Sequence, residues 1–194
     1  EIDAHVVHIS TDFIFDGQDG PYDENGVPNP VSYYGETKLQ AEHIVQEVNS
    51  WSILRTVLVI GIAEDLSRSN IVLWAKKALE NAQPIRVVDD QFRTPTLAED
   101  LAQGALLAAT QRAHGIFNIS GPDFMSIYEL VEAVAKHFNL SMDTVTRVDS
   151  STLNQPAMRP PRTGFDISKA VEKMGYRPHS FNEALEIIAQ QAGL

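Results

Sequence analysis

The run His5-Val-Val-His-Ile-Ser-Thr11 decides the fold, together with the loop and the helix that follow it. Residues 5–9 are too few and too rich in β-branched side chains for a helix, so they predict a short buried strand. Residues 11–30 are rich in Gly, Asp, Asn and Pro and predict a loop. From residue 30 to about residue 49, apolar side chains recur at helical spacing. This order of strand, loop and helix is typical of the βαβ units that build parallel sheets.

Strands and helices continue to alternate along the rest of the chain. Apolar runs predict strands at residues 51–60, 85–88 and 115–120, and helical patterns occupy residues 69–81, 97–110, 127–137, 166–174 and 181–194. Capping boxes mark the starts of the helices at 97–110, 127–137 and 181–194, and they are Thr96 with Glu99, Ser126 with Glu129 and Ser180 with Glu183. The sequence therefore predicts an α/β fold with a mostly parallel sheet.

The composition excludes several classes of protein. The 194 residues include 15 Lys and Arg against 26 Asp and Glu, which gives a formal net charge of −11. Phosphate backbones and anionic membranes need a basic face, so we expect neither a nucleic-acid partner nor a membrane. The chain has no Cys, which excludes disulfides and thiolate metal sites, and its His residues lack ligand spacing, so no metal is expected. We expect a cytoplasmic protein.

Ligands bind at the carboxyl ends of the strands in parallel α/β sheets, which points to the loops after Ser10, Ile60 and Ser120. The sharpest signal nearby is Tyr34-Gly-Glu-Thr-Lys38, at the start of the first helix. Residues four apart lie on one helix face, so a lysine ammonium can stabilise the phenolate form of the tyrosine. Such a phenol can donate a proton to a substrate oxygen. The same spacing also fits an exposed pair without a catalytic role.

Longer stretches of the chain resemble one enzyme family. They are His8-Ile-Ser-Thr-Asp-Phe-Ile-Phe-Asp-Gly17, Pro21-Tyr-Asp-Glu24, Asn29-Pro-Val-Ser-Tyr-Tyr-Gly-Glu-Thr-Lys-Leu-Gln-Ala-Glu42, Leu54-Arg-Thr56, Asp90-Gln-Phe-Arg-Thr-Pro-Thr96, Phe117-Asn-Ile-Ser-Gly121 and Arg159-Pro-Pro-Arg-Thr-Gly-Phe-Asp166. These stretches are similar to the extended short-chain dehydrogenase/reductases, and most similar to the dTDP-4-dehydrorhamnose reductases. The resemblance implies a Rossmann-like parallel sheet, the C-terminal part of a doubly wound fold, with a small α/β substrate-binding region.

The resemblance also implies a division of the chain and a role for each matched residue. Residues 1–62 would belong to the Rossmann domain, to which strand 115–120 and helix 97–110 return, and residues 63–194 would mainly bind substrate. Tyr34 would be the acid and base, Lys38 would tune it and bind the nicotinamide ribose, and Thr11 would orient the keto oxygen. Ser10 would be a further cofactor contact, and Asp12 a substrate contact.

The implied cofactor is NADPH or NADH, and the implied substrate is a 4-keto-6-deoxy sugar bound to a nucleotide. A homodimer is the candidate assembly. Two features depart from the family pattern. The Gly-rich dinucleotide fingerprint is absent, because Gly17 and Gly20 do not open a helix, so we expect the cofactor-binding first third to be missing and this piece alone to be inactive. The family usually places a Trp after the Arg-Thr strand, and Leu58 occupies that place as a substrate-contact candidate.

Three arginines are further candidates for the site. Arg159 and Arg162 lie in a proline-rich loop, and their guanidinium groups suit the phosphates of a nucleotide sugar. A role in pairing with the excess of carboxylates fits them equally. Arg93 replaces a residue that is more often small in the family, and it either reaches the site or covers the seam between the two regions.

The sequence leaves three functions open. The first is NAD(P)H-dependent reduction of a nucleotide-bound 4-keto-6-deoxy sugar. The second is a non-catalytic regulatory subunit resembling that of methionine adenosyltransferase, because a binding protein can keep a site that it uses only for a cofactor. The third is another sugar-nucleotide epimerase or dehydratase, although nothing in the sequence indicates the additional acid–base pair that a dehydratase needs.

Overall fold

The computed structural model describes residues 3–62, 70–153 and 157–193. The helices are α1 (Tyr33–Gln46), α2 (Ile71–Glu80), α3 (Ala98–Gln111), α4 (Ile127–His137), α5 (Ser168–Met174) and α6 (Phe181–Ala192). The strands are β1 (Val6–Thr11), β2 (Trp51–Thr56), β3 (Val59–Ile60), β4 (Ile85–Val88), β5 (Phe92–Arg93), β6 (Thr96–Leu97), β7 (Gly115–Asn118), β8 (Met125–Ser126) and β9 (Val145–Val148). Short 3-10 turns are η1 (Asp12–Ile14) and η2 (Ser150–Thr152). Within these described ranges no helix is long and apolar enough to cross a membrane.

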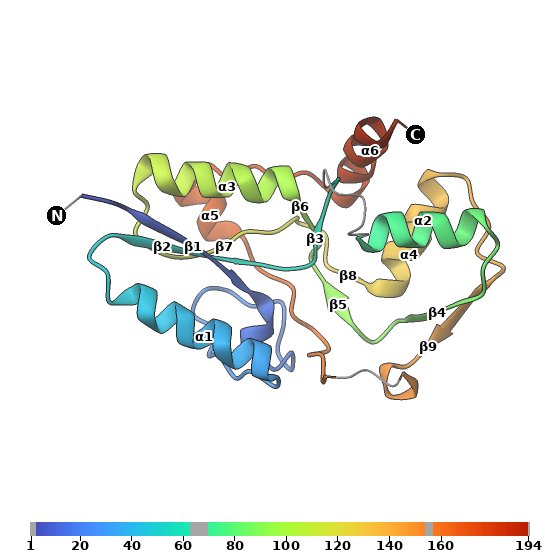
Figure 1. The fold of residues 1–194 in the computed structure, drawn as a ribbon, viewed down its shortest axis with the longest axis horizontal. Helices are drawn as coiled ribbons and strands as arrows, with labels where there is room; N and C mark the ends of the chain where they lie inside the picture. The colour runs from blue at the N-terminus through green and yellow to red at the C-terminus, as the bar shows by residue number, and fades with distance from the viewer. Residues whose placement is uncertain (1–2, 63–69, 154–156, 194) are drawn as a thin grey trace.

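A three-stranded parallel sheet in the order β1-β2-β7 organises one end of the molecule. β1 pairs with β2 from Val6 opposite Trp51 to Thr11 opposite Thr56. Figure 1 shows α1 on one face of this sheet and α3 and α5 on the other. Buried apolar side chains fill the second interface, among them Leu54, Ala108, Phe117, Met174 and Tyr176. The predicted α/β fold with a parallel sheet is confirmed.

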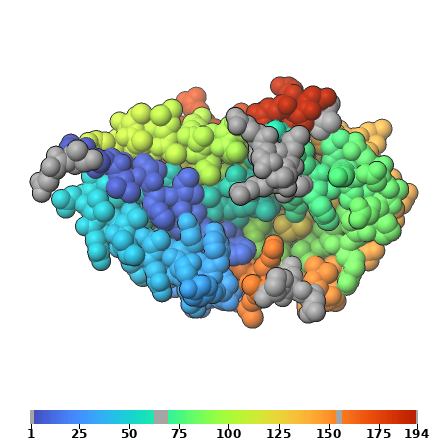
Figure 2. All heavy atoms as spheres, viewed as in Figure 1, coloured from blue at the N-terminus to red at the C-terminus, as the bar shows by residue number. Residues whose placement is uncertain are grey.

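A second and larger core surrounds the parallel pair β4-β9 at the other end of the molecule. Helices α2, α4 and α6 supply most of it, with buried residues that include Val72, Leu79, Leu130, Val134, Leu185 and Ile188. The two-residue pairs β3-β6 and β5-β8 lie between this core and the three-stranded sheet in Figure 1. Figure 2 shows the blue and cyan amino-terminal residues at one end and green residues of α2 at the other. The division of the chain at residue 62 stays a prediction.

Two local expectations were wrong. The predicted strand 51–60 is divided into β2 and β3, because Leu58 between them adopts a left-handed backbone with φ 42°. The capping box expected at Thr96 does not form. Thr96 instead pairs in β6, its hydroxyl donates to the carbonyl of Val57 at 2.6 Å, and α3 begins after Leu97. The boxes at Ser126 and Ser180 are confirmed.

Helix α1 begins where side-chain capping and close packing coincide. The Ser32 hydroxyl accepts a hydrogen bond from the amide of Gly35 at 3.2 Å and so caps the helix. Gly35 also lies against η1, since a Cβ at this position would be 2.1 Å from the carbonyl oxygen of Phe13. Only glycine allows this approach. The first turn of α1, which carries Tyr34, is therefore held close to the end of β1.

A buried ion pair joins the middle of α1 to the sheet. Glu42 of α1 and Arg55 of β2 have side chains that are 1% and 3% exposed. The guanidinium is bidentate, with Nη2 at 2.8 Å from Oε2 and Nε at 3.1 Å from Oε1. The Arg55 group also lies over the ring of Phe15, 5.3 Å from its centroid. Charge pairing inside the protein thus fixes the rotation of α1 about its axis.

We expect Arg55→Met to lower the free energy of unfolding by about 3–5 kcal/mol, because it leaves the Glu42 carboxylate buried without a partner. Urea unfolding followed by circular dichroism measures the loss. The double variant Arg55→Met/Glu42→Leu replaces both charges by apolar groups and should recover most of it. A loss below about 1 kcal/mol in the single variant would contradict a stabilising role for the pair.

Candidate active site

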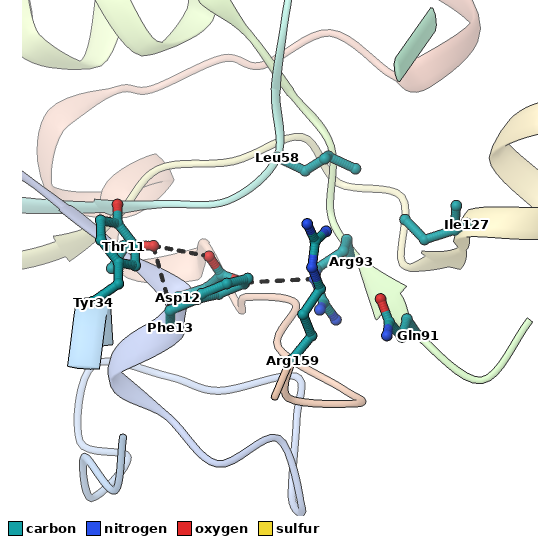
Figure 3. Close-up of a pocket in the computed structure, with 9 residues that line it drawn as sticks. All are labelled: Thr11, Asp12, Phe13, Tyr34, Leu58, Gln91, Arg93, Ile127 and Arg159. Carbon is teal, nitrogen blue, oxygen red and sulfur yellow. Dashed lines mark hydrogen bonds and ion pairs between the residues drawn. The ribbon is translucent and has the colours of Figure 1, made fainter. Parts of the chain in front are cut away.

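A cavity of about 230 Å³ opens at the carboxyl end of β1 (Figure 3). Its walls come from parts of the chain that are far apart in sequence: the end of β1 with η1, the start of α1, the turn between β2 and β3, the segment around β5, the start of α4 and the loop after residue 157. The lining residues are Thr11, Asp12, Phe13, Tyr34, Leu58, Gln91, Arg93, Ile127 and Arg159. The cavity therefore lies at the sheet edge that the sequence predicts.

Tyr34 and Lys38 lie one turn apart at the start of α1. The Tyr34 side chain lines the cavity and is 53% exposed, and its ring meets that of Phe13 edge-on with centroids 6.0 Å apart. The Lys38 ammonium donates a hydrogen bond to the carbonyl oxygen of Ile9 in β1 at 2.7 Å. This contact uses one of its three donors. The lysine charge is thus held at the strand, and the tyrosine ring is open to a ligand.

Thr11, the last residue of β1, gives its hydroxyl hydrogen to the protein. Its Oγ1 donates to Oδ1 of Asp12 at 3.1 Å and accepts from the amide of Phe13 at 3.3 Å. An ionised carboxylate can only accept, whereas a ketone oxygen needs a donor. To orient a keto oxygen, Thr11 must therefore turn its hydrogen away from Asp12.

Asp12 is enclosed by groups from three segments. Its side chain is 4% exposed, its Oδ2 accepts from the hydroxyl of Thr163, and the same oxygen lies 3.6 Å from Nε of Arg93. Burial raises the pKa of the Asp12 carboxyl, although Arg93, Thr163 and Thr11 all favour its ionised form. The carboxylate thereby joins η1 to β5 and to the loop before α5. Both oxygens of Asp12 are already engaged within the protein. A substrate contact by Asp12 stays a prediction.

Two further predicted residues differ in their surroundings. Ser10 is 2% exposed, and its Oγ has no hydrogen-bond partner among the described residues. Leu58 lines the cavity from the turn after β2, where its positive φ separates β2 from β3. The cavity thus has an apolar wall at the position where the family usually places a Trp.

The two arginines of the proline-rich loop take different positions. Arg159 is exposed and lines the cavity. Arg162 is not among the lining residues, and its guanidinium lies 4.6 Å from the ring centroid of Phe92 and 5.0 Å from that of Phe124. Cation–π contacts of this kind hold the loop on β5. A phosphate contact by Arg162 is therefore a prediction without geometric support, whereas Arg159 has access to a ligand.

No sequence pattern predicted Gln91 or Ile127 as lining residues. Gln91 belongs to the stretch Asp90-Gln-Phe-Arg-Thr-Pro-Thr96 that carries the family resemblance, and that stretch was the signal available for it. Ile127 begins α4, where nothing local distinguishes it from core residues. Arg93, for which two interpretations were open, lines the cavity and is 4% exposed.

A second cavity of about 250 Å³ adjoins the first. The two share Phe13, Tyr34 and Arg159, and the second is completed by Ser32, Tyr33, Ala157 and Met158. Tyr34 and Arg159 thus face both spaces. Together the cavities offer room for a ligand that is longer than a single sugar.

A parallel α/β sheet with a Ser-Thr strand end beside a Tyr-x-x-x-Lys helix defines the class of extended short-chain dehydrogenase/reductases. Within this class the chain belongs to the RmlD substrate binding domain family, which matches residues 1–193. The family resemblance predicted from the sequence is therefore confirmed.

The curated relatives include a polysaccharide biosynthesis protein and subunits of methionine adenosyltransferase. The spore coat polysaccharide biosynthesis protein SpsK of Bacillus subtilis (strain 168) is 32% identical over 194 residues, which cover 98% of this chain and 65% of SpsK. The methionine adenosyltransferase 2 subunit beta of Danio rerio is 30% identical over 172 residues, which cover 86% of this chain and 53% of that protein. The chain thus spans about half the length of the latter subunit and less than two thirds of SpsK.

Solved structures show the same fold. A dTDP-4-dehydrorhamnose reductase from Clostridium acetobutylicum ATCC 824 superposes with a TM-score of 0.89 at 27% identity, covering 98% of this chain and 67% of that chain. The same enzyme from Bacillus anthracis str. Ames, in complex with NADP, has a TM-score of 0.87 at 26% identity over 97% of this chain and 66% of that chain. A UDP-glucuronic acid 4-epimerase from Bacillus cereus, in complex with UDP-glucuronic acid and NAD, has a TM-score of 0.77 at 25% identity, covering 95% and 60%. Proteins with this fold thus bind nicotinamide dinucleotides and nucleotide sugars.

The raised pKa of Asp12 predicts a pH dependence of stability. A carboxyl whose pKa is higher in the folded than in the unfolded chain stabilises the fold fully below its unfolded value of 3.8, and this contribution is lost as the pH rises through the folded pKa. We therefore expect the free energy of unfolding of the wild type, relative to Asp12→Asn, to fall as the pH rises above 3.8. Urea unfolding of both proteins measures the difference, and a difference that rises over this range would contradict the direction.

Proposed function

We propose that the protein carries the catalytic and substrate-binding part of an NAD(P)H-dependent reductase that acts on the keto group of a nucleotide-bound 4-keto-6-deoxy sugar. The observation that supports this most directly is the shared cavity of Tyr34 and Thr11 at the carboxyl end of β1. The family and the superposition on dTDP-4-dehydrorhamnose reductases support the same reaction class.

The residues around Tyr34 fit a nicotinamide cofactor. Lys38 uses one donor on Ile9, which leaves two N–H groups for ribose hydroxyls. The buried Oγ of Ser10 has no partner in the described part of the chain, so a polar group beside β1 would satisfy it. Tyr34, Lys38 and Ser10 would therefore hold the nicotinamide end, and the bound cofactor supplies a hydride to the keto carbon.

The side chains of this protein would supply the proton that the keto oxygen takes up. Tyr34 donates its phenolic hydrogen to the keto oxygen as negative charge develops there. The Lys38 ammonium, fixed on Ile9, stabilises the phenolate that is left. Thr11 helps only after its hydrogen has left Asp12 for the substrate oxygen. One fully available donor and one that must turn are thus directed at the same atom.

The remainder of the cavity suits a deoxy sugar with an anionic extension. Leu58, Ile127 and Phe13 supply apolar surface, against which a methyl group at C6 can pack. Arg159 lies at the border of the two cavities, where its guanidinium can bind the diphosphate of a nucleotide. Because Leu58 stands where the family usually places a Trp that touches the sugar, no particular sugar is assigned.

A regulatory subunit is the second candidate function. The observation that favours it is the 30% identity to the methionine adenosyltransferase 2 subunit beta of Danio rerio. On this alternative the cavity serves binding alone, and Thr11 keeps its hydrogen on Asp12. Tight association with a methionine adenosyltransferase catalytic subunit, in the absence of turnover, would favour it.

Tyr34→Phe is expected to lower kcat by about 10²–10⁴-fold, because it removes the proton donor and leaves the ring in place. NADPH oxidation with a dTDP-4-keto-6-deoxy sugar should be followed in the natural polypeptide that contains residues 1–194. The matched control is Tyr33→Phe, which removes a hydroxyl from the neighbouring, 81% exposed tyrosine and should keep kcat within about twofold. Equal rates in wild type and Tyr34→Phe would refute the proton-donor role.

A further inference from the structure

A single guanidinium, that of Arg93, connects the reacting end of the cavity to the loop that bears Arg159. Its side chain is 5% exposed. Its Nη1 donates to the carbonyls of Phe92 at 2.6 Å and Pro161 at 3.1 Å, and its Nη2 donates to the carbonyl of Pro160 at 2.8 Å. Its Nε lies 3.6 Å from the Asp12 carboxylate, and Figure 3 marks this ion pair with a dashed line.

The two prolines make these contacts effective. Pro160 and Pro161 have fixed φ angles, so ψ is the main freedom left to this part of the loop. Hydrogen bonds to both carbonyls fix that remaining freedom. The Pro161 carbonyl also accepts from the amide of Phe92 at 2.7 Å, which places the loop along β5. Arg159, next in the chain to Pro160, is thereby held at the border of the two cavities.

Only an arginine can make this set of contacts. Its planar fork presents several N–H groups in fixed directions, toward two neighbouring carbonyls on one side and a carboxylate on the other. A lysine at this position would keep the positive charge near Asp12 but would have a single nitrogen to share. Charge compensation and loop positioning can therefore be separated by substitution.

We propose that Arg93 is a positioning residue for nucleotide-sugar binding: it fixes the 159–163 loop, and so Arg159, relative to Thr11 and Asp12. This inference rests on the proposed function for the identity of the ligand. It does not rest on it for the mechanics of the loop. The side chain touches neither the reacting oxygen nor the proton donor in this assignment, and it acts through Asp12 and the two proline carbonyls.

The test uses Arg93→Lys and two readouts. Hydrogen exchange should accelerate about tenfold or more at the amides of Arg162 and Thr163, and remain unchanged in β2. Calorimetry with dTDP should show affinity reduced by about tenfold, and in the turnover assay KM should rise more than kcat falls. Arg112→Lys is the matched control, because Arg112 pairs with Asp3 on the exposed surface at 2.6 Å; both readouts should stay at wild-type values.

The outcomes separate the inference from the proposed function. Wild-type exchange and wild-type dTDP affinity in Arg93→Lys would overturn the inference, since charge alone would then suffice. If the wild type itself does not bind dTDP, the proposed function fails, and the exchange measurement still decides the role of Arg93 in the loop. Should Arg93→Lys not fold, Arg93→Met/Asp12→Asn removes fork and charge together; faster exchange confined to the loop supports the inference, and unchanged exchange overturns it.

Discussion

The site depends on the burial of one carboxylate, that of Asp12, at the point where β1 ends. A carboxylate that is almost entirely withdrawn from water is tolerated only when its oxygens find donors and a counter-charge. Thr11, Thr163 and Arg93 provide them from three separate segments. Because Thr163 and Arg93 both engage Asp12, η1, β5 and the loop before α5 are fixed relative to one another. The cavity is the space left between these segments.

The attachment of the loop before α5 to β5 explains why its two arginines have different roles. The Arg162 guanidinium lies over the rings of Phe92 and Phe124, so its charge stabilises the loop on β5. Arg159 lies beyond Pro160, on the side that the Arg93 contacts hold toward the cavities. The sequence alone does not distinguish the two arginines. In the structure they differ, because only Arg162 contacts aromatic rings where the loop is attached to β5.

Local patterns in the sequence predicted many of the helices and strands, but they did not predict the long-range contacts that hold the walls of the cavity together. The strand before Ser10, the helix that begins near Tyr33 and the capping boxes at Ser126 and Ser180 depend on neighbours within a few residues, and each was predicted. Thr96 has the same local pattern, but it lies in β6 beside β3, and its hydroxyl donates to the carbonyl of Val57. Tyr34, Lys38 and Thr11 came from a motif. The residues of the hydrogen bond between Thr163 and Asp12 are 151 positions apart in the sequence, so no local pattern predicts it.

The hydrogen of Thr11 is where the two candidate functions of this fold diverge. A protein that uses the cavity only for binding has no ketone to serve, and Thr11 can leave its hydrogen on Asp12 in every state. A reductase must direct that hydrogen to the substrate oxygen as charge develops there, and Asp12 then loses one donor. Thr163 and Arg93 remain on the other carboxylate oxygen in both states, so the buried charge is never left without partners. The contacts of Thr163 and Arg93 with Asp12 therefore allow Thr11 to act on a substrate while η1, β5 and the loop before α5 stay joined.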